Sequence, residues 1–138
     1  MSMESKIVSL EELGKITAKL KKQGKKIAQC HGCFDLLHPG HIKHFEAAKN
    51  VADVVVVTLT PDRFVNKGPG RPVFTEKLRL ESIAALQAVD YVALNHWGTA
   101  IETVKIVKPD FYIKGQDYKD SKKDITGNIE KEEKAVLS

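Results

Sequence analysis

The sequence lacks the features that mark several protein classes. Two cysteines in 138 residues cannot form a disulfide framework. Apolar runs reach only four residues, as at residues 54–57, whereas a membrane-spanning helix needs about 20. No basic segment followed by an apolar stretch opens the chain, so we expect no export and a cytoplasmic location. There is no internal repeat, and the 42% hydrophobic content is too high for a disordered segment.

What is present is typical of one soluble domain over residues 1–138, because a chain of this length buries roughly two thirds of its unfolded surface. The formal charge is +4, and a twelve-residue window holds six lysines and no acid. No aromatic residue alternates with these lysines, so we interpret them as a solvated helix face and expect no nucleic-acid partner. A basic surplus also suits small anionic substrates such as nucleotides. The six are Lys15, Lys19, Lys21, Lys22, Lys25 and Lys26.

Helix and strand signals alternate along the chain. Ser9 and Glu12 form a capping box before apolar residues at helical spacing, and Pro39 suits the first turn of a second helix. Residues 54–59 are almost wholly β-branched, which is typical of a strand buried on both faces. The pattern predicts helices over residues 9–23, 39–50, 75–87, 99–107 and 128–138, the fourth of them capped by Thr99 with Glu102. It predicts strands over residues 27–30, 54–59, 89–94 and 111–113.

This alternation predicts an α/β domain whose parallel sheet is wrapped by helices. The apolar positions of the second helix are Ile42, Phe45 and Ala48, and we expect the core side of the third to be Leu78, Ile83, Ala84 and Leu86.

Ligands of such sheets bind at the loops that follow the strands, here residues 31–41, 59–71, 94–98 and 114–127. Prolines and glycines in residues 60–73 predict a mobile loop. There is no GxGxxG motif, and Gly68-Pro69-Gly70-Arg71 is not a Walker loop, which argues against a dinucleotide dehydrogenase or a P-loop kinase.

Residues 30–44 concentrate the reactive side chains, with four of the five histidines and both cysteines. One interpretation is an anion site. His38 and His41 flank the start of a helix, whose free N–H groups and dipole attract phosphate. Gly32 and Gly40 would let the backbone approach the ligand closely. Two imidazoles there can donate hydrogen bonds to phosphoryl oxygens and stabilise a transition state.

Two other interpretations of this segment remain open. A metal site is one, because CxxC and HxxH spacings occur, although structural zinc sites usually place a dozen or more residues between ligand pairs. A redox dithiol is the other, although a reactive thiol normally lies at a helix N-terminus. Phe34 after Cys33 excludes the CxxCH haem motif. The residues in question are Cys30, Cys33, His38, His41 and His44.

Residues 32–41, Gly-Cys-Phe-Asp-Leu-Leu-His-Pro-Gly-His, resemble the GxFDxxHxGH signature of the cytidylyltransferase-like nucleotidyltransferase superfamily. The resemblance covers residues 25–120. Its Arg-Pro-Val and Lys-Gly-x-Asp-Tyr segments look most like the nucleotidyltransferase domain of heptose-phosphate enzymes of lipopolysaccharide precursor synthesis, and less like the glycerol-3-phosphate or phosphocholine enzymes. The further matches are Pro61-Asp62, Lys67, Arg71-Pro72-Val73, Glu76, Arg79 and Lys114-Gly115-Gln116-Asp117-Tyr118.

The resemblance implies a Rossmann-like sheet of strand order 3-2-1-4-5 with helices on both faces. It implies transfer of CMP or AMP from CTP or ATP to a small phosphorylated acceptor such as heptose 1-phosphate, with release of pyrophosphate and with Mg²⁺ on the nucleotide. No membrane partner is implied, and a homodimer is compatible with the family. The implied catalytic residues are His38, His41 and Lys67. The implied nucleotide-binding residues are Gly32, Cys33, Phe34, Asp35, Gly40, Gly115 and Asp117, and the candidate acceptor-binding residues are Arg71, Arg79 and His96.

Several alternatives stay open. Asp35 could cap a turn, Lys67 could be a solvated loop residue, and Asp117 could serve only the turn after Gly115. Arg79 could pair with Glu76 on its own helix, with equal weight to phosphate binding.

His44 is expected on the surface, and His31 has no assigned role. The whole domain could also be a nucleotide-binding module without efficient turnover, a glycerol-3-phosphate, phosphocholine or phosphoethanolamine cytidylyltransferase, or a metal or dithiol module.

The resemblance also bears on the C-terminus. Family members continue into a fifth strand and a Ser/Thr-rich segment, whereas this sequence ends at Ser138 within an expected helix. We therefore expect a truncated domain end, an unpaired apolar strand edge at residues 111–113, and weak turnover unless a further segment or a partner covers that edge.

Overall fold

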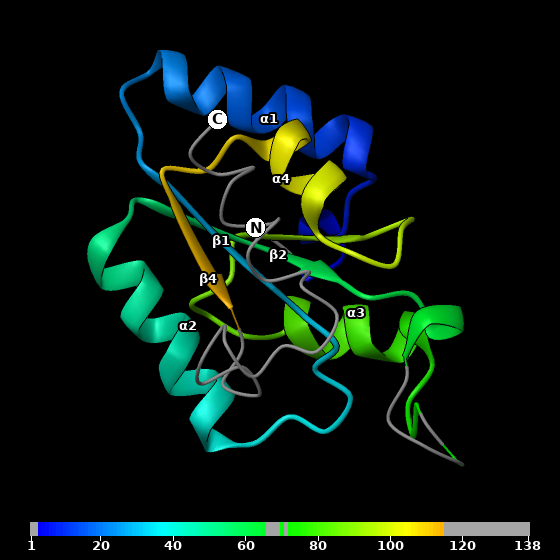
Figure 1. Ribbon diagram of the computed structural model, residues 1–138. Coiled ribbons are helices and arrows are strands. Elements are labelled where there is room, and N and C mark those ends of the chain that lie inside the picture. The colour runs from blue at the N-terminus through cyan, green and yellow to red at the C-terminus, as the bar shows by residue number, and fades with distance from the viewer. Residues whose placement is uncertain (1–2, 66–69, 71, 115–138) are drawn as a thin grey trace, which may run out of the picture.

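The computed structural model describes residues 3–65, 70 and 72–114, which form a four-stranded parallel sheet with helices on both faces (Figure 1). The strand order is β3-β2-β1-β4, so the expected α/β class and order are confirmed for these strands. The strands are β1 (Ile27–Gly32), β2 (Val54–Leu59), β3 (Tyr91–Leu94) and β4 (Phe111–Lys114). The helices are α1 (Leu10–Lys22), α2 (Pro39–Val51), α3 (Glu76–Ala84) and α4 (Ile101–Val107), with 3-10 turns η1 (Glu4–Lys6) and η2 (Asp62–Phe64).

The two central strands carry the core. Every residue of β2 is buried, because helices cover both faces of a parallel sheet and leave no solvated side. In the register, Gly32 at the end of β1 lies beside Leu59 of β2, which in turn lies beside Leu94 of β3. The loops that follow these strands therefore leave from one edge of the sheet, where a ligand of this fold class would bind.

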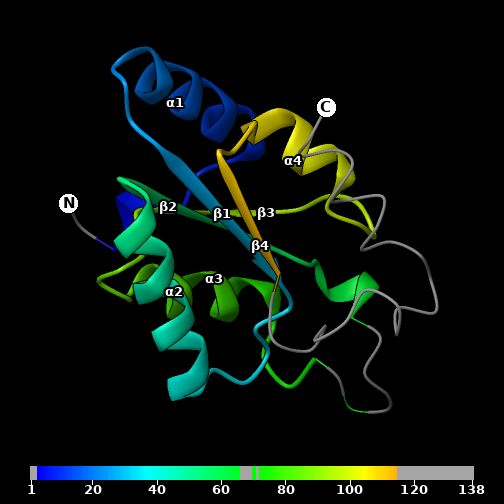
Figure 2. The same ribbon diagram turned by 60° about the vertical axis from the view of Figure 1, so that its left-hand side comes forward.

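Helices α2 and α3 cover one face of the sheet, and α1 and α4 lie side by side on the other (Figures 1 and 2). Gly14 allows the close approach of α1 and α4, since a Cβ there would lie 3.0 Å from Ile106 Cγ2. The α2/α3 side includes Phe45, Ala48, Val55, Val57, Ile83 and Ala84. The α1/α4 side includes Leu10, Leu13, Ile27, Val56, Ala93 and Val107.

An aspartate stands directly before each of the three later strands and fixes the start of the neighbouring strand. Its carboxylate accepts a backbone N–H there, a charge-assisted bond that is stronger than a neutral one. The bonds run from Lys26 N to Asp53, from Val55 N to Asp90 and from Ile27 N to Asp110, each at 2.8 Å. Asp90 also pairs with Lys49 of α2 at 2.6 Å. The sequence reasoning did not single out these residues.

The starts of the first two helices agree with the sequence prediction. Ser9 caps α1 by accepting from Glu12 N, and its hydroxyl lies 3.4 Å from the Glu12 carboxylate. Pro39 occupies the first turn of α2. The predicted Thr99–Glu102 box at α4 is wrong, because Ala100 is the N-cap and has no side-chain cap bond, while Thr99 Oγ1 accepts from Ile101 N.

The predicted core face of α3 is confirmed at Ile83 and Ala84, which are buried, and Leu86 packs against the same core. It is wrong at Leu78, which is 47% exposed, whereas Arg79 beside it is 1% exposed. The helix also ends at Ala84, three residues before the predicted end. Arg79 can occupy an inward position because oxygen atoms of Cys33, Thr60 and Asp62 accept its hydrogen bonds.

Two smaller observations concern α2 and β3. Ile42, an apolar position of α2, is exposed. Strand β3 begins at Tyr91, two residues later than predicted, although Val89 is buried before it.

Among the described strands, β4 is an edge, and Phe111 at its start is 41% exposed. The predicted helix over residues 128–138 lies outside the described residues. None of the helices in the described part of the chain has the length and apolar content that crossing a bilayer requires.

Candidate active site

The segment between β1 and α2 brings His38 and His41 together. His38 is the N-cap of α2, and the ring centroids of His38 and His41 lie 3.9 Å apart. The Nδ1 of His38 accepts from Gly40 N at 3.0 Å, and the Nδ1 of His41 accepts from His38 N at 3.4 Å. An imidazole that accepts at Nδ1 carries its proton on Nε2 when it is neutral. Both rings are therefore held as Nε2–H donors.

The expectation of free backbone N–H groups at this helix start is wrong. Pro39 has none, Gly40 N donates to the His38 side chain, and His41 N and Ile42 N donate to His38 O. A histidine that caps its own helix uses the donors that an anion would otherwise meet. An anion at this end of α2 would meet the helix dipole and the imidazole N–H donors.

Phe34 lies beneath the histidine pair. Its ring makes edge-to-face contacts with His41, at a centroid distance of 5.4 Å, and with Phe45, at 5.1 Å. A Cβ on Gly32 would lie 2.9 Å from Phe34 Cζ. The space beside Gly32 is thus filled by this ring.

Asp35 connects the β1–α2 loop to the segment before α3. It is buried, and its two carboxylate oxygens accept from Val73 N at 2.8 Å and Phe74 N at 2.9 Å. These partners lie 38 and 39 positions away. The carboxylate therefore does more than cap the local turn that the sequence suggested.

Arg79 makes a second connection to the same loop. Its guanidinium donates to Cys33 O at 2.9 Å, Thr60 O at 2.7 Å and Asp62 Oδ1 at 2.8 Å. The predicted pair with Glu76 is wrong, since Glu76 instead accepts from Asp62 N. Arg79 Nε is buried without a partner among the described residues. These contacts give Arg79 a structural role, and we do not include it in a substrate site.

The cysteines do not form a reactive pair. Cys30 lies inside β1, and burial raises the pKa of its thiol to about 12. Cys33 is half-buried, and no disulfide joins the two. Within the described residues, no three His, Cys, Asp or Glu side chains are grouped as metal ligands. The dithiol and metal interpretations therefore find no support in this geometry.

His31, which had no predicted role, is buried, and His44 is less exposed than expected. His31 is buried, and its Nδ1 lies 2.8 Å from Thr58 Oγ1, which also accepts from Gln29 Nε2. Thr58 carries the one hydroxyl in the valine-rich strand β2, and this feature of the sequence could have indicated the polar contact. His44 is half-buried, and its Nε2 has no partner among the described residues. Burial lowers the pKa of His44 below 6.5.

His96 lies just after β3, exposed next to Trp97, with ring centroids 5.7 Å apart. Its carbonyl accepts from Arg63 of η2 at 2.7 Å. His96 lies at the edge of the sheet where ligands of this fold class bind, so it remains a candidate for acceptor binding. Lys67, Arg71, Gly115 and Asp117 lie outside the described residues.

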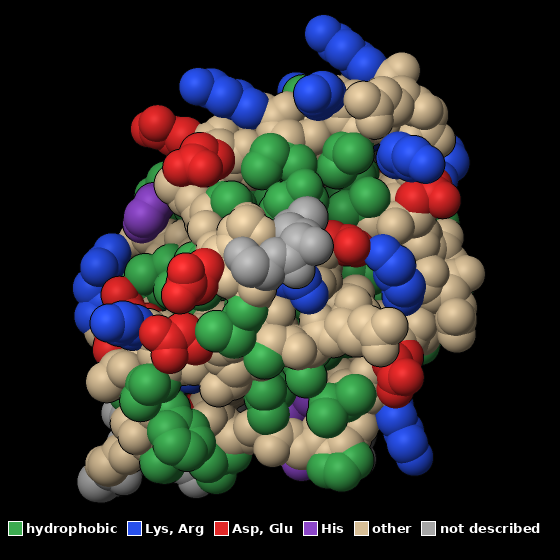
Figure 3. Space-filling model, turned by 180° about the vertical axis from the view of Figure 1, so that it is seen from behind, with side chains coloured by type: hydrophobic (Ala, Val, Ile, Leu, Met, Phe, Trp, Pro, Cys, Tyr) green, Lys and Arg blue, Asp and Glu red, His purple; other side chains and the backbone are tan. Residues whose placement is uncertain are grey.

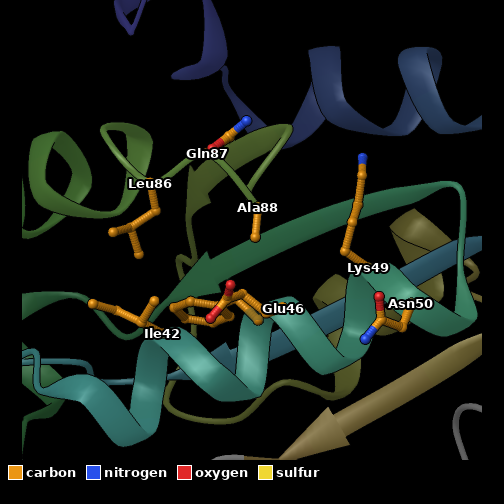
Figure 4. Close-up of a pocket in the computed structure, with 8 residues that line it drawn as sticks. Ile42, Glu46, Lys49, Asn50, Leu86, Gln87 and Ala88 are labelled. Atoms are coloured by element: carbon orange, nitrogen blue, oxygen red, sulfur yellow. The ribbon is translucent and has the colours of Figure 1, made fainter.

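A hollow of about 470 Å³ lies elsewhere, between α2 and the connection from α3 to β3 (Figure 4). None of the predicted site residues lines it, so the histidine site is a surface at the strand ends and not this hollow. Its lining residues are Ile42, Phe45, Glu46, Lys49, Asn50, Leu86, Gln87 and Ala88.

The face of the molecule seen from behind carries Lys and Arg side chains spread around its margin (Figure 3). Among the described residues they do not gather there into one patch. The lysines of α1 are exposed, as a solvated helix face requires.

Comparison with known proteins agrees with the site geometry. Residues 29–137 match the family model described as Cytidylyltransferase-like. The chain is 41% identical over 135 residues to the bifunctional protein HldE of a Nitratiruptor species, which covers 96% of this chain and 29% of that protein. It is 44% identical over 122 residues to the bifunctional protein HldE of Campylobacter jejuni, covering 87% of this chain and 26% of that protein. The chain thus spans less than a third of these relatives.

A solved structure is also similar. The crystal structure of the lipopolysaccharide core biosynthesis protein from Thermoplasma volcanium GSS1 has a TM-score of 0.65 and 34% sequence identity, covering 78% of this chain and 88% of that chain. The family match covers most of the chain and includes the whole GxFDxxHxGH segment that carried the sequence resemblance. The chain therefore belongs to the cytidylyltransferase-like family.

Proposed function

We propose that this chain is a nucleotidyltransferase domain that transfers AMP or CMP from ATP or CTP to a sugar phosphate and releases pyrophosphate. The observation that carries the proposal is the pair of imidazoles at the start of α2, held with both Nε2–H groups as donors. In the proposed reaction an acceptor phosphate oxygen attacks the α-phosphorus in line, and pyrophosphate leaves. No covalent enzyme intermediate is needed, so positioning and charge stabilisation supply the catalysis.

His38 and His41 would donate to phosphoryl oxygens as negative charge develops on them. The rings lie side by side at the positive end of a thirteen-residue helix, which favours an anion at that place. Because their Nδ1 atoms accept from backbone amides, the rings need little reorganisation before the reaction. Lys67, Arg71, Gly115 and Asp117 are proposed to complete the phosphate and nucleotide contacts, by family resemblance alone.

Mg²⁺ fits this site only as a companion of the nucleotide. Asp35, the carboxylate nearest in sequence to the histidines, already accepts from two backbone amides, and the described residues hold no ligand cluster. Mg²⁺ prefers oxygen ligands and commonly binds through substrate phosphates and water. It would supply charge neutralisation on the triphosphate, and no step assigned to the protein residues depends on it.

A sugar phosphate is the proposed acceptor because the relatives are HldE proteins and a lipopolysaccharide core biosynthesis protein. The exposed His96 at the end of β3 is the described residue that we propose for acceptor contact. The choice between ATP and CTP is left to experiment.

The test is a pyrophosphate-release assay with Mg²⁺, in which ATP and CTP are each combined with heptose 1-phosphate, glycerol 3-phosphate, phosphocholine or phosphoethanolamine. We expect turnover with one nucleotide and heptose 1-phosphate. Turnover with glycerol 3-phosphate or a phosphobase alone would refute the sugar-phosphate acceptor. Nucleotide binding without turnover for any pair would instead identify a binding module.

The histidine role is tested by His41→Ala, which should lower kcat about 10²-fold or more, as the loss of a transition-state donor does. The matched control is His44→Gln, a histidine on the same helix outside the proposed site, which should retain kcat. Circular dichroism should show both variants folded. Near-normal kcat in His41→Ala would remove this residue from catalysis.

A further inference from the structure

We infer that the Phe34 side chain is a positioning residue that sets the orientation of the His41 imidazole. The inference rests on the proposed function for its kinetic consequence, and it assigns a role to the Phe34 side chain itself.

A long hydrogen bond and an aromatic contact act together on His41. The distance from His38 N to His41 Nδ1 is 3.4 Å, longer than the 2.9–3.0 Å of a typical N–H bond. The ring of Phe34 meets His41 at an interplanar angle of 88°, a favourable geometry for two aromatic rings. Packing against Phe34 therefore adds a restraint on the imidazole to that of this hydrogen bond.

Phe34 in turn is held in a conformation that a bulky residue rarely adopts, with φ of +48°. Its two chain neighbours are both tied to the segment at the start of α3. Arg79 donates to the Cys33 carbonyl, and the Asp35 carboxylate accepts from Val73 N and Phe74 N. These bonds fix the backbone on either side of Phe34, whose ring packs against His41.

Gly32 completes the arrangement. A Cβ at this position would lie 2.9 Å from Phe34 Cζ and 3.0 Å from Cε2, so any larger residue must displace the ring. The need for glycine here comes from the side chain of Phe34, two residues further along the chain.

Two substitutions test the inference in opposite ways. Phe34→Leu removes the ring, and Gly32→Ala keeps the ring but displaces it. In the pyrophosphate-release assay each should lower kcat about 10-fold or more, because small misplacements of a catalytic group are costly. Phe45→Leu is the comparison variant, since it removes a ring that packs against Phe34 and His44. It should lower kcat much less.

A spectroscopic measurement makes the test independent of activity. Imidazole ¹⁵N shifts, assigned with His41→Gln, report which ring nitrogen carries the proton. In the unsubstituted chain His41 should be the Nε2–H form. In Phe34→Leu and Gly32→Ala it should become a mixture of tautomers, because the contact between Nδ1 and His38 N–H is lost, whereas exposed His96 should not change.

An unchanged His41 tautomer in both variants would overturn the inference, as would an equal loss of kcat in Phe45→Leu. If Phe34→Leu does not fold, Phe34→Met and Gly32→Ala provide the same two readouts. Absence of turnover in the unsubstituted chain would refute the proposed function, and the ¹⁵N measurement would still decide the role of Phe34.

Discussion

Replacement of Arg79 by Met measures how much the buried guanidinium stabilises the junction of β1, β2 and α3. Met keeps the apolar stem but removes the donors to Cys33 O, Thr60 O and Asp62. Two carbonyls then lose a buried partner, at about 1–3 kcal/mol each. Asp62 is 38% exposed and regains water, so its share is small. Because Met is neutral, the substitution also removes the cost of burying the Arg79 charge, and this offsets part of the loss.

The expected net loss is about 3 kcal/mol, a large fraction of the roughly 5–15 kcal/mol typical of a domain. Urea unfolding followed by far-UV circular dichroism measures it, and the midpoint should fall by about 1–2 M. Arg79→Lys should show an intermediate loss, because a lysine retains the charge without the planar fork.

Lys77→Met on the exposed side of the same helix is the matched control, and it should change stability by no more than about 0.5 kcal/mol. A loss below about 1 kcal/mol in Arg79→Met would refute the magnitudes assigned to these hydrogen bonds. Equal losses in the two variants would assign the effect to the helix and not to the buried guanidinium.

Two further predictions concern titratable groups. In the native chain a thiol reagent at pH 8 should modify Cys33 alone, because burial raises the pKa of Cys30 to about 12. Cys30 should react only in denaturant, and rapid modification of both thiols would contradict its burial. For His44, the lowered pKa means that the unfolded chain binds more protons than the folded one below pH 6.5, so the free energy of unfolding should fall as the pH drops from 7 to 5. His44→Gln should reduce this slope, and identical slopes would show that His44 is not the responsible group.

Much of the fold followed from local patterns. The capping residue Ser9, the valine run of β2 and Pro39 at the start of α2 each act within a few residues, so the sequence reveals them directly. The strand order needed the family resemblance, since nothing in a periodic pattern says which strands become neighbours. The burial of Arg79 in α3 was missed because a periodicity argument assigns an arginine to the surface, and only its distant acceptors make position 79 an interior one.

The sequence predicted some features of the candidate site and missed others. The histidine pair and its place at a helix start were correct, because both follow from residues 38–41. Their hydrogen bonds were not foreseen, since a histidine cap that occupies the N–H groups of its own helix depends on side-chain rotation. Asp35 and Arg79 were predicted near the ligand, and the structure shows in addition that both hold the loop in place through long-range hydrogen bonds.

The sequence by itself determined the elements, the apolar strands of the core and the HxGH segment at the strand-to-helix turn. Only the tertiary structure decided how that segment is supported, because its anchors join residues 38 and 46 positions apart. Gly32 illustrates the division. At Gly32 the folded chain places the Phe34 ring where a Cβ would lie, and the sequence did not predict this contact, since side-chain packing depends on three-dimensional contacts that no spacing along the chain encodes.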